Sequence, residues 1–225
     1  MQSINPEDLV PMDVFEDEYP IIVDIVYTQA EHPENVFKTA LYRLNTKLWL
    51  HKDMARIVLR AASICFHQQG WKLRLKDGLR TVEAQAAMLE TEIVKANPQW
   101  IAEGPKRLLS PPGRGGHPRG MAIDVTVQDE DANTVDMGTI FDYLTKDPDN
   151  NPAARNYNDF GENTDEILRN RKVLEDAFLK AGEEDGKEIL PLPQEWWDFR
   201  FPYEYSRQFK PLSDHDLPEE MRMTI

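Results

Sequence analysis

The chain has 225 residues, of which 40% are hydrophobic, and a formal net charge of -14. This length and apolar content suit a single domain spanning residues 1–225. An acidic surface repels phosphate backbones and anionic lipid, so neither nucleic acid nor a membrane is expected as a partner. A small zwitterionic substrate remains compatible with this charge, and oligomeric state stays open.

The sequence contains one cysteine, Cys65, within an apolar stretch. One cysteine cannot form an intramolecular disulfide, so we interpret it as a small buried hydrophobe. Residues 1–13 lack the basic start and apolar run of a signal peptide. We therefore expect a cytoplasmic protein, although a periplasmic protein whose signal peptide had been removed would have the same sequence.

In the first half of the chain, side-chain periodicity predicts two strands and two helices. The expected strands are 20–28 and 71–76, and the expected helices are 45–69, closed by Gly70, and 81–96, with Thr81 as a possible N-cap. Trp71 and Trp100 are interpreted as core residues.

The second half begins with a Pro/Gly-rich loop, 109–116, that leads directly to His117. The sequence then predicts a strand at 121–127, a turn at 129–133, a helix at 164–181 ended by Gly182, and a strand at 195–201. The polar stretch within 144–163 predicts a surface loop or lid. Helices and strands mixed irregularly in this way indicate the α+β class.

His117 and Asp124 stand seven residues apart, where the glycine-rich loop passes into a strand. An imidazole and a carboxylate so placed could bind one zinc ion, and Gly116 and Gly120 would allow close backbone approach. The alternative is two unrelated polar residues.

Two further motifs carry reactive side chains. Glu195 precedes Asp198 by three residues, a spacing at which a glutamate could take a proton from metal-activated water while the aspartate holds the metal. Arg80 follows a predicted strand and could stabilise an oxyanion. For Glu195 and Asp198, the alternative is a core strand whose acidic side chains are exposed. For Arg80, the alternative is a surface salt bridge.

Together these motifs resemble the D-alanyl-D-alanine dipeptidases, which include the vancomycin-resistance enzymes and are related to lysostaphin-like enzymes and the hedgehog signalling domain. The order is Asp-Gly-x-Arg, His-x-x-Gly-x-Ala-x-Asp, Asp-Met-Gly-Thr-x-Phe-Asp, Asn-Arg and Glu-Trp-Trp. The matching stretches are 77–80, 117–127, 135–143, 170–182 and 192–201. Five motifs in the family's order are far more specific than any one of them.

The resemblance implies a small antiparallel sheet flanked by helices, with the metal on one sheet face. It implies that one zinc ion is held by His117, Asp124 and the residue at position 198. Metal-bound water would be the nucleophile, with Glu195 as general base and then general acid, and Arg80 would stabilise the tetrahedral intermediate. Asp142, or less favourably Asp136, would hold the substrate amine, and Asp77 is a further candidate for substrate binding.

The chain departs from the family at two positions. Asp198 stands where the family has its third zinc-binding histidine, and Gly115 stands where it usually has serine. One imidazole and two carboxylates leave a zinc ion with a charge close to zero, so bound water becomes less acidic and harder metals such as manganese are favoured. Asp198 could therefore bind a metal with altered preference, His215 could replace it, or the site could be impaired.

Three functions follow. The first is metal-dependent hydrolysis of D-Ala-D-Ala or a closely related dipeptide. The second is a cell-wall carboxypeptidase or endopeptidase of the same fold, and the third is a peptide-binding protein that has lost its metal. In each, the expected partner is a small peptide.

Overall fold

The computed structural model describes residues 1–224, and it confirms the α+β class. Five strands form the main sheet in the order β2-β4-β5-β7-β6. Their bounds are Ile21–Val23 (β2), Lys72–Asp77 (β4), Ala122–Gln128 (β5), Leu190–Pro191 (β6) and Asp198–Arg200 (β7). All neighbouring pairs are antiparallel except β2 and β4. A second, two-stranded sheet pairs β1 (Leu9–Pro11) with β3 (Trp49–His51).

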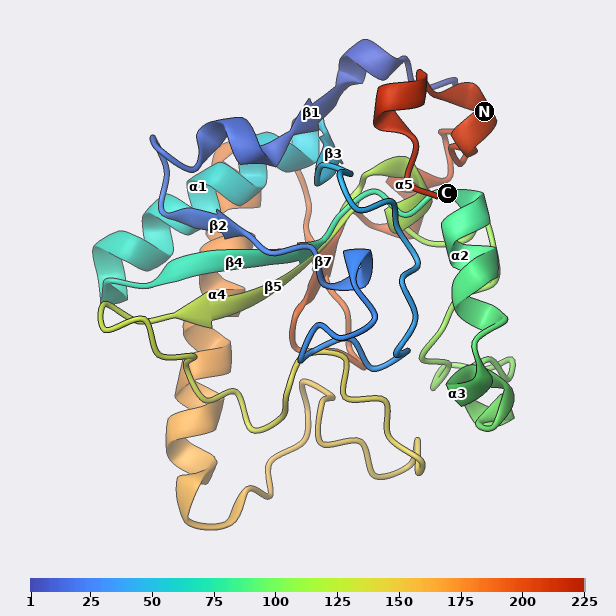
Figure 1. Ribbon diagram of the computed structural model, residues 1–225. Helices are drawn as coiled ribbons and strands as arrows, with labels where there is room; N and C mark the ends of the chain where they lie inside the picture. Colours follow the sequence, from blue (N-terminus) through green and yellow to red (C-terminus); the bar gives the residue numbers. More distant parts are fainter. Residues whose placement is uncertain (225) are drawn as a thin grey trace.

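Two long helices, α1 (Lys52–Gln69) and α4 (Thr164–Glu184), pack against each other and cover one face of the main sheet (Figure 1). On that face, Phe178 of α4 stacks on Phe199 of β7 with ring centroids 3.9 Å apart. The shorter helices are α2 (Val82–Leu89), α3 (Glu92–Lys95) and α5 (Tyr203–Ser206). Because the long helices occupy one face, the opposite face of the sheet is left to loops and to the polar residues described below.

The predicted helices exist, but their ends differ from the prediction. The first begins at residue 52, because residues 49–51 pair with β1. The second breaks into α2 and α3 around Thr91, whose hydroxyl donates to the Met88 carbonyl. The last runs through Gly182, where a Cβ would lie 2.7 Å from the Lys187 carbonyl oxygen, so this glycine permits a close contact and does not end the helix.

Two predicted strands are much shorter than expected. The stretch 20–28 forms only β2 before a 3-10 turn at Val26–Thr28, and the stretch 195–201 forms only β7. In the first case Val26 and Tyr27 are fully buried, so their apolar character reflects a turn packed into the core. The segment 144–163 contains no α-helix or strand and one 3-10 turn, Gly161–Asn163. Its role as a lid stays a prediction.

Cys65, Trp71 and Trp100 are all buried, as predicted. No helix among residues 1–224 is both long and apolar enough to cross a bilayer.

Replacing Lys76 of β4 with methionine should lower the free energy of unfolding by about 1–3 kcal/mol, because the partly exposed carboxylate of Glu34 loses its cation and Asp24 keeps only Arg74 as a permanently charged partner. The Lys76 side chain is 1% exposed, and its ammonium pairs with Asp24 at 2.7 Å and with Glu34. Urea denaturation measures the loss. Lys72→Met, at an exposed position of the same strand, is the control and should change stability by less than about 0.5 kcal/mol. Equal losses in the two variants would contradict this prediction.

Candidate active site

Strand register aligns three carboxylates across the open face of the sheet. Asp124 of β5 lies opposite Asp198 of β7 on one side and opposite Asp77 of β4 on the other. Since side chains alternate along a strand, Phe199 points to the helices while its neighbours at 198 and 200 point to the other face. The same alternation that buries the aromatic core therefore gathers the acids at one place.

His117 reaches this row of acids from a 3-10 turn, His117–Arg119, that ends at Gly120 in the left-handed conformation with φ of 62°. A Cβ on Gly120 would lie 2.7 Å from the His51 backbone nitrogen, so the predicted close approach is confirmed. The imidazole Nδ1 lies 2.8 Å from the Gly78 carbonyl oxygen, to which it donates. This bond turns the other ring nitrogen toward the carboxylates.

The three predicted metal-binding side chains converge. His117 Nε2 lies 3.5 Å from Asp124 Oδ2 and 3.3 Å from Asp198 Oδ2. Ligand atoms bound tetrahedrally to zinc at about 2.0–2.2 Å stand about 3.3–3.6 Å apart, so both distances from the imidazole fit neighbouring ligands of a divalent cation. The other Asp124 oxygen is buried and has no hydrogen-bond partner among residues 1–224. The donor set thus fits a metal ion, with two carboxylates and one imidazole.

The charge of this cluster is balanced within the protein. Burial would lower the pKa of His117, but the Asp124 and Asp198 carboxylates outweigh it and raise that pKa to about 10. Burial likewise opposes ionisation of Asp198, yet Arg200 and His117 hold its pKa well below the usual range. Arg200 Nε donates to Asp198 Oδ1 at 2.7 Å, and its Nη2 contacts Oδ2. Asp198, which stands where the resemblance to the dipeptidases implies a histidine, therefore forms an ion pair with Arg200 of the same strand.

Glu195 lies in the same pocket and forms a close group with Asp124 and Asp198, their ligand atoms all within 4.8 Å of one another. Burial, followed by the charges of those two aspartates, raises the pKa of Glu195 well above its usual value. A raised pKa makes a carboxylate a stronger proton acceptor, which suits a general base.

Arg80 lines the pocket, whereas Asp77 lies behind it. Arg80 Nε donates to Asp77 Oδ2 at 2.8 Å, and Asp77 Oδ1 accepts from the Tyr42 hydroxyl at 2.7 Å. Asp77 is 1% exposed and is not among the residues that line the pocket. The prediction that Asp77 contacts substrate is therefore corrected: it orients Arg80, because both its oxygens already accept from protein groups.

Of the two candidates for binding an amine, the structure brings only Asp142 to the pocket. Asp142 accepts from the Tyr27 hydroxyl and has φ of 54°, a strained conformation for a residue other than glycine. Burial, reinforced by Asp124, raises its pKa to about 7. Asp136 lies outside the pocket and caps the Gly138 amide.

The alternative ligand His215 is exposed in a short 3-10 turn, Asp214–Asp216, and belongs to none of the potential metal-binding groups within residues 1–224. A second such group, Asp24, His32 and Glu34, already surrounds the ammonium of Lys76. The row of acids around His117 is therefore the better candidate for a metal centre.

Comparison with known proteins places the chain in a peptidase family. A sequence model of the peptidase family M15, described as D-Ala-D-Ala dipeptidase, matches residues 9–215. The chain belongs to this family. It is similar to the D-alanyl-D-alanine dipeptidase of Escherichia coli K12, with 28% identity over 174 residues that cover 75% of this chain and 74% of the relative. Among solved structures it is similar to the L-Ala D-Glu endopeptidase ChiX of Serratia marcescens, with 12% identity, a TM-score of 0.37, and coverage of 69% of this chain and 83% of the other.

The family motifs did not identify three side chains that shape the site, namely Arg200, Tyr27 and Arg155. Arg200 could have been found from strand alternation, since it lies two residues after Asp198. Tyr27 comes from a distant turn, and no sequence signal links it to Asp142.

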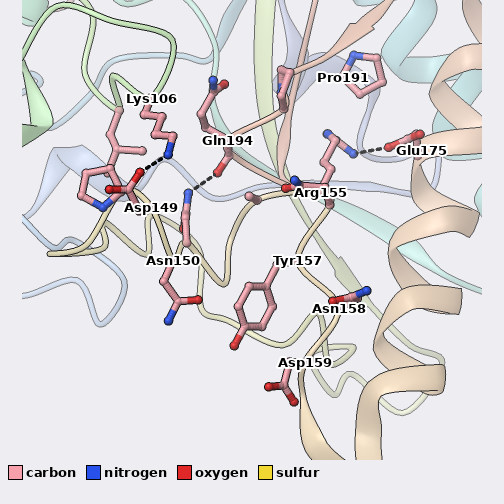
Figure 2. A pocket seen from close by; sticks show the side chains of 16 residues that line it. Lys106, Asp149, Asn150, Arg155, Tyr157, Asn158, Asp159, Glu175, Pro191 and Gln194 are labelled. Atoms are coloured by element: carbon pink, nitrogen blue, oxygen red, sulfur yellow. Dashed lines mark hydrogen bonds and ion pairs between the residues drawn. The ribbon is translucent and has the colours of Figure 1, made fainter.

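Arg155, in the loop 144–163, holds the chain on both sides of Glu195. It donates to the carbonyl oxygens of residues 192, 196 and 198 at 2.9–3.0 Å and to Glu175 at 2.8 Å. Figure 2 shows Arg155 beside Glu175. Both residues line a cavity of about 910 Å³ that shares Leu108 with the pocket around His117. The loop is thus attached to the backbone that positions the candidate general base.

Proposed function

We propose that this family member hydrolyses the D-alanyl-D-alanine dipeptide, or a closely related small cell-wall peptide, with the help of a divalent metal ion. The observation that carries the proposal is that the His117 imidazole lies 3.3–3.5 Å from carboxylate oxygens of both Asp124 and Asp198. Glu195 forms a close group with the same two aspartates. Membership of a peptidase family supports the same reaction class. We further propose that the protein acts in the cytoplasm.

The three converging side chains would hold the metal, which we propose to be zinc. When bound, such an ion supplies Lewis acidity that polarises a peptide carbonyl and makes water more acidic. Two carboxylate ligands favour a harder ion such as manganese more than two imidazoles would. Arg200 draws charge away from Asp198 and thereby partly offsets this effect.

Glu195 would take a proton from the attacking water and later deliver it to the nitrogen of the departing alanine. Its burial next to two aspartates supports the first step, because a raised pKa makes the carboxylate a stronger base toward the attacking water. Arg80 would donate to the oxyanion that forms at the peptide carbonyl, since Asp77 holds its guanidinium at the pocket wall. Asp142 would bind the ammonium group of the substrate.

The size of the catalytic pocket favours a dipeptide over a longer peptide. It leaves about 40 Å³ for the centres of water molecules, and Leu108, Leu109 and Ser110 contribute to its wall. That space holds about three waters, so even a dipeptide requires displacement of solvent and adjustment of the wall. A pentapeptide stem would require much larger movement.

Purified protein reconstituted with zinc, manganese or cobalt should release D-alanine from D-Ala-D-Ala, and faster than from a pentapeptide stem. Metal analysis accompanies the assay. Faster cleavage of the pentapeptide would indicate a carboxypeptidase or endopeptidase. Less than about a tenth of an equivalent of bound metal, together with no release under any of the three ions, would refute the proposal and favour a binding protein.

The dependence of activity on pH should reveal the charge on Asp142. Because its pKa is raised to about 7, this carboxyl is neutral below that pH and charged above it. Attraction of the substrate ammonium is therefore fully present well above pH 7 and lost as pH falls, so KM for the dipeptide should rise about fivefold between pH 7 and pH 6. Asp142→Asn should raise KM and flatten this dependence. A wild-type KM that is constant over this range would contradict the assignment.

Asp198→His restores the family's ligand, and from sequence alone it should raise metal affinity. The structure changes this expectation, because Arg200 would lose both of its acceptors while remaining buried beside a cation. We expect the single variant to bind zinc no more tightly than wild type, and Asp198→His combined with Arg200→Met to bind it at least about tenfold more tightly. Competition with a chromogenic chelator measures both, and equal affinities of the single and double variants would contradict the coupling.

A further inference from the structure

Arg200 has a donor that its ion pair does not use. Its Nε and Nη2 both engage Asp198, and no hydrogen bond reaches Nη1 among the described residues 1–224. The side chain is only 16% exposed and lines the catalytic pocket. A guanidinium whose third nitrogen is unpaired inside a pocket is a ready partner for a carboxylate.

The free nitrogen faces the other position at which this chain departs from its family. A Cβ built on Gly115 would lie 3.6 Å from Arg200 Nη1 and 3.8 Å from the Ser110 hydroxyl oxygen. Gly115 has φ of 87°, a conformation that few other residues adopt, and Arg119 holds its carbonyl with a hydrogen bond of 2.8 Å. The absence of a side chain at Gly115 thus leaves space in front of the Arg200 nitrogen. The backbone conformation of Gly115, held by Arg119, favours glycine at this position and so keeps that space free.

Another guanidinium of the pocket wall, that of Arg80, is already assigned to the oxyanion and to Asp77. Arg80 directs Nε and Nη2 to Asp77, and its Nη1 lies 3.6 Å from the Met88 sulfur. The remaining arginine in the wall, Arg114, is exposed. A dipeptide brings one ammonium and one carboxylate, and Asp142 matches the first. Arg200 is the buried cation with a donor to spare for the second.

We propose that Arg200 binds the C-terminal carboxylate of the substrate through Nη1 while Asp198 holds its other nitrogens. Arg200 would then be a specificity-determining residue that restricts this enzyme to peptides with a free carboxylate next to the scissile bond. This inference rests on the proposed dipeptidase function and adds to it a residue that recognises one end of the substrate.

The test compares D-Ala-D-Ala with its C-terminal amide, which has the same shape but no carboxylate. The metal-loaded wild-type protein should prefer the acid by about 10- to 100-fold in kcat/KM. In Arg200→Lys, the ammonium still neutralises Asp198 but cannot also reach the substrate, so the preference should fall below about threefold. A merely structural role for Arg200 would lower both activities equally and leave their ratio unchanged.

Binding is measured separately by calorimetry in Glu195→Gln protein, in which turnover should be at least about a hundredfold slower than in wild type. There the acid should bind about 10- to 100-fold more tightly than the amide, and adding Arg200→Lys should remove the difference. Arg114→Gln is the matched control and should keep the preference for the acid over the amide. A preference that survives Arg200→Lys, or that disappears in Arg114→Gln instead, overturns the inference while the dipeptidase function stands. Acid-selective binding that depends on Arg200 but is accompanied by no wild-type turnover refutes only the proposed reaction, and absence of binding by either ligand refutes both.

Discussion

Replacing Glu195 with glutamine should lower kcat for dipeptide hydrolysis by about a hundred- to ten-thousandfold, because the amide cannot accept a proton from water. The fold should survive. Burial and the charges of Asp198 and Asp124 raise the pKa of the Glu195 carboxyl, so its neutral form resembles the amide in shape and charge. Steady-state kinetics on metal-loaded protein, with thermal unfolding in parallel, measures both effects.

Two observations separate loss of the base from loss of the site. Metal content and substrate affinity of Glu195→Gln should stay within about twofold of wild type, since none of the three converging ligands is altered. Gln194→Ala, at the neighbouring position, removes a side chain that contacts the Pro105 carbonyl at the surface, and it should leave kcat within about threefold of wild type. If kcat of Glu195→Gln fell by less than about tenfold, another group would have to serve as the base.

Replacing His117 with alanine should reduce bound metal to less than about a tenth of an equivalent and abolish measurable hydrolysis. His117 provides the imidazole at the centre of the cluster, 3.5 Å from Asp124 and 3.3 Å from Asp198. Without it, the two carboxylates keep only the arginines as counterions. We therefore also expect a lower free energy of unfolding, by about 1–3 kcal/mol.

The matched control is His67→Ala, which removes an imidazole from an exposed position of α1. It should retain full metal content and activity. Elemental analysis after dialysis and chemical denaturation of both variants distinguish loss of a ligand from loss of the fold. Stoichiometric metal in folded His117→Ala would show that the cation is held elsewhere and would remove the basis of the proposed mechanism.

Local sequence patterns predicted most of the elements but few of their ends. The 3.6-residue periodicity identified α1, yet it could not reveal that residues 49–51 pair with β1, since those residues fit either pattern. The sequence pattern predicts that Gly182 ends a helix, whereas the structure shows that a close contact with the chain after the helix requires this glycine. End positions depend on contacts with distant segments, and periodicity does not encode those contacts.

The candidate site was predictable to the extent that its residues stand in ordered motifs. His117, Asp124, Glu195 and Arg80 were all found in this way, and the structure brings them into one pocket. The motifs also suggested Asp77 as a substrate-binding residue, whereas its carboxylate accepts from Arg80 and Tyr42. A motif gives the residue types at its positions but not the directions of their side chains.

The sequence by itself determined the reaction class, the α+β elements and the acids and imidazole that meet at the site. Only the tertiary structure decided how those groups are neutralised and held: Arg200 pairs with Asp198, Tyr27 donates to Asp142, and Arg155 holds the chain on both sides of Glu195. The physical reason is that strand register and turn geometry set the distances between side chains remote in sequence. Ion pairing and pKa depend steeply on those distances.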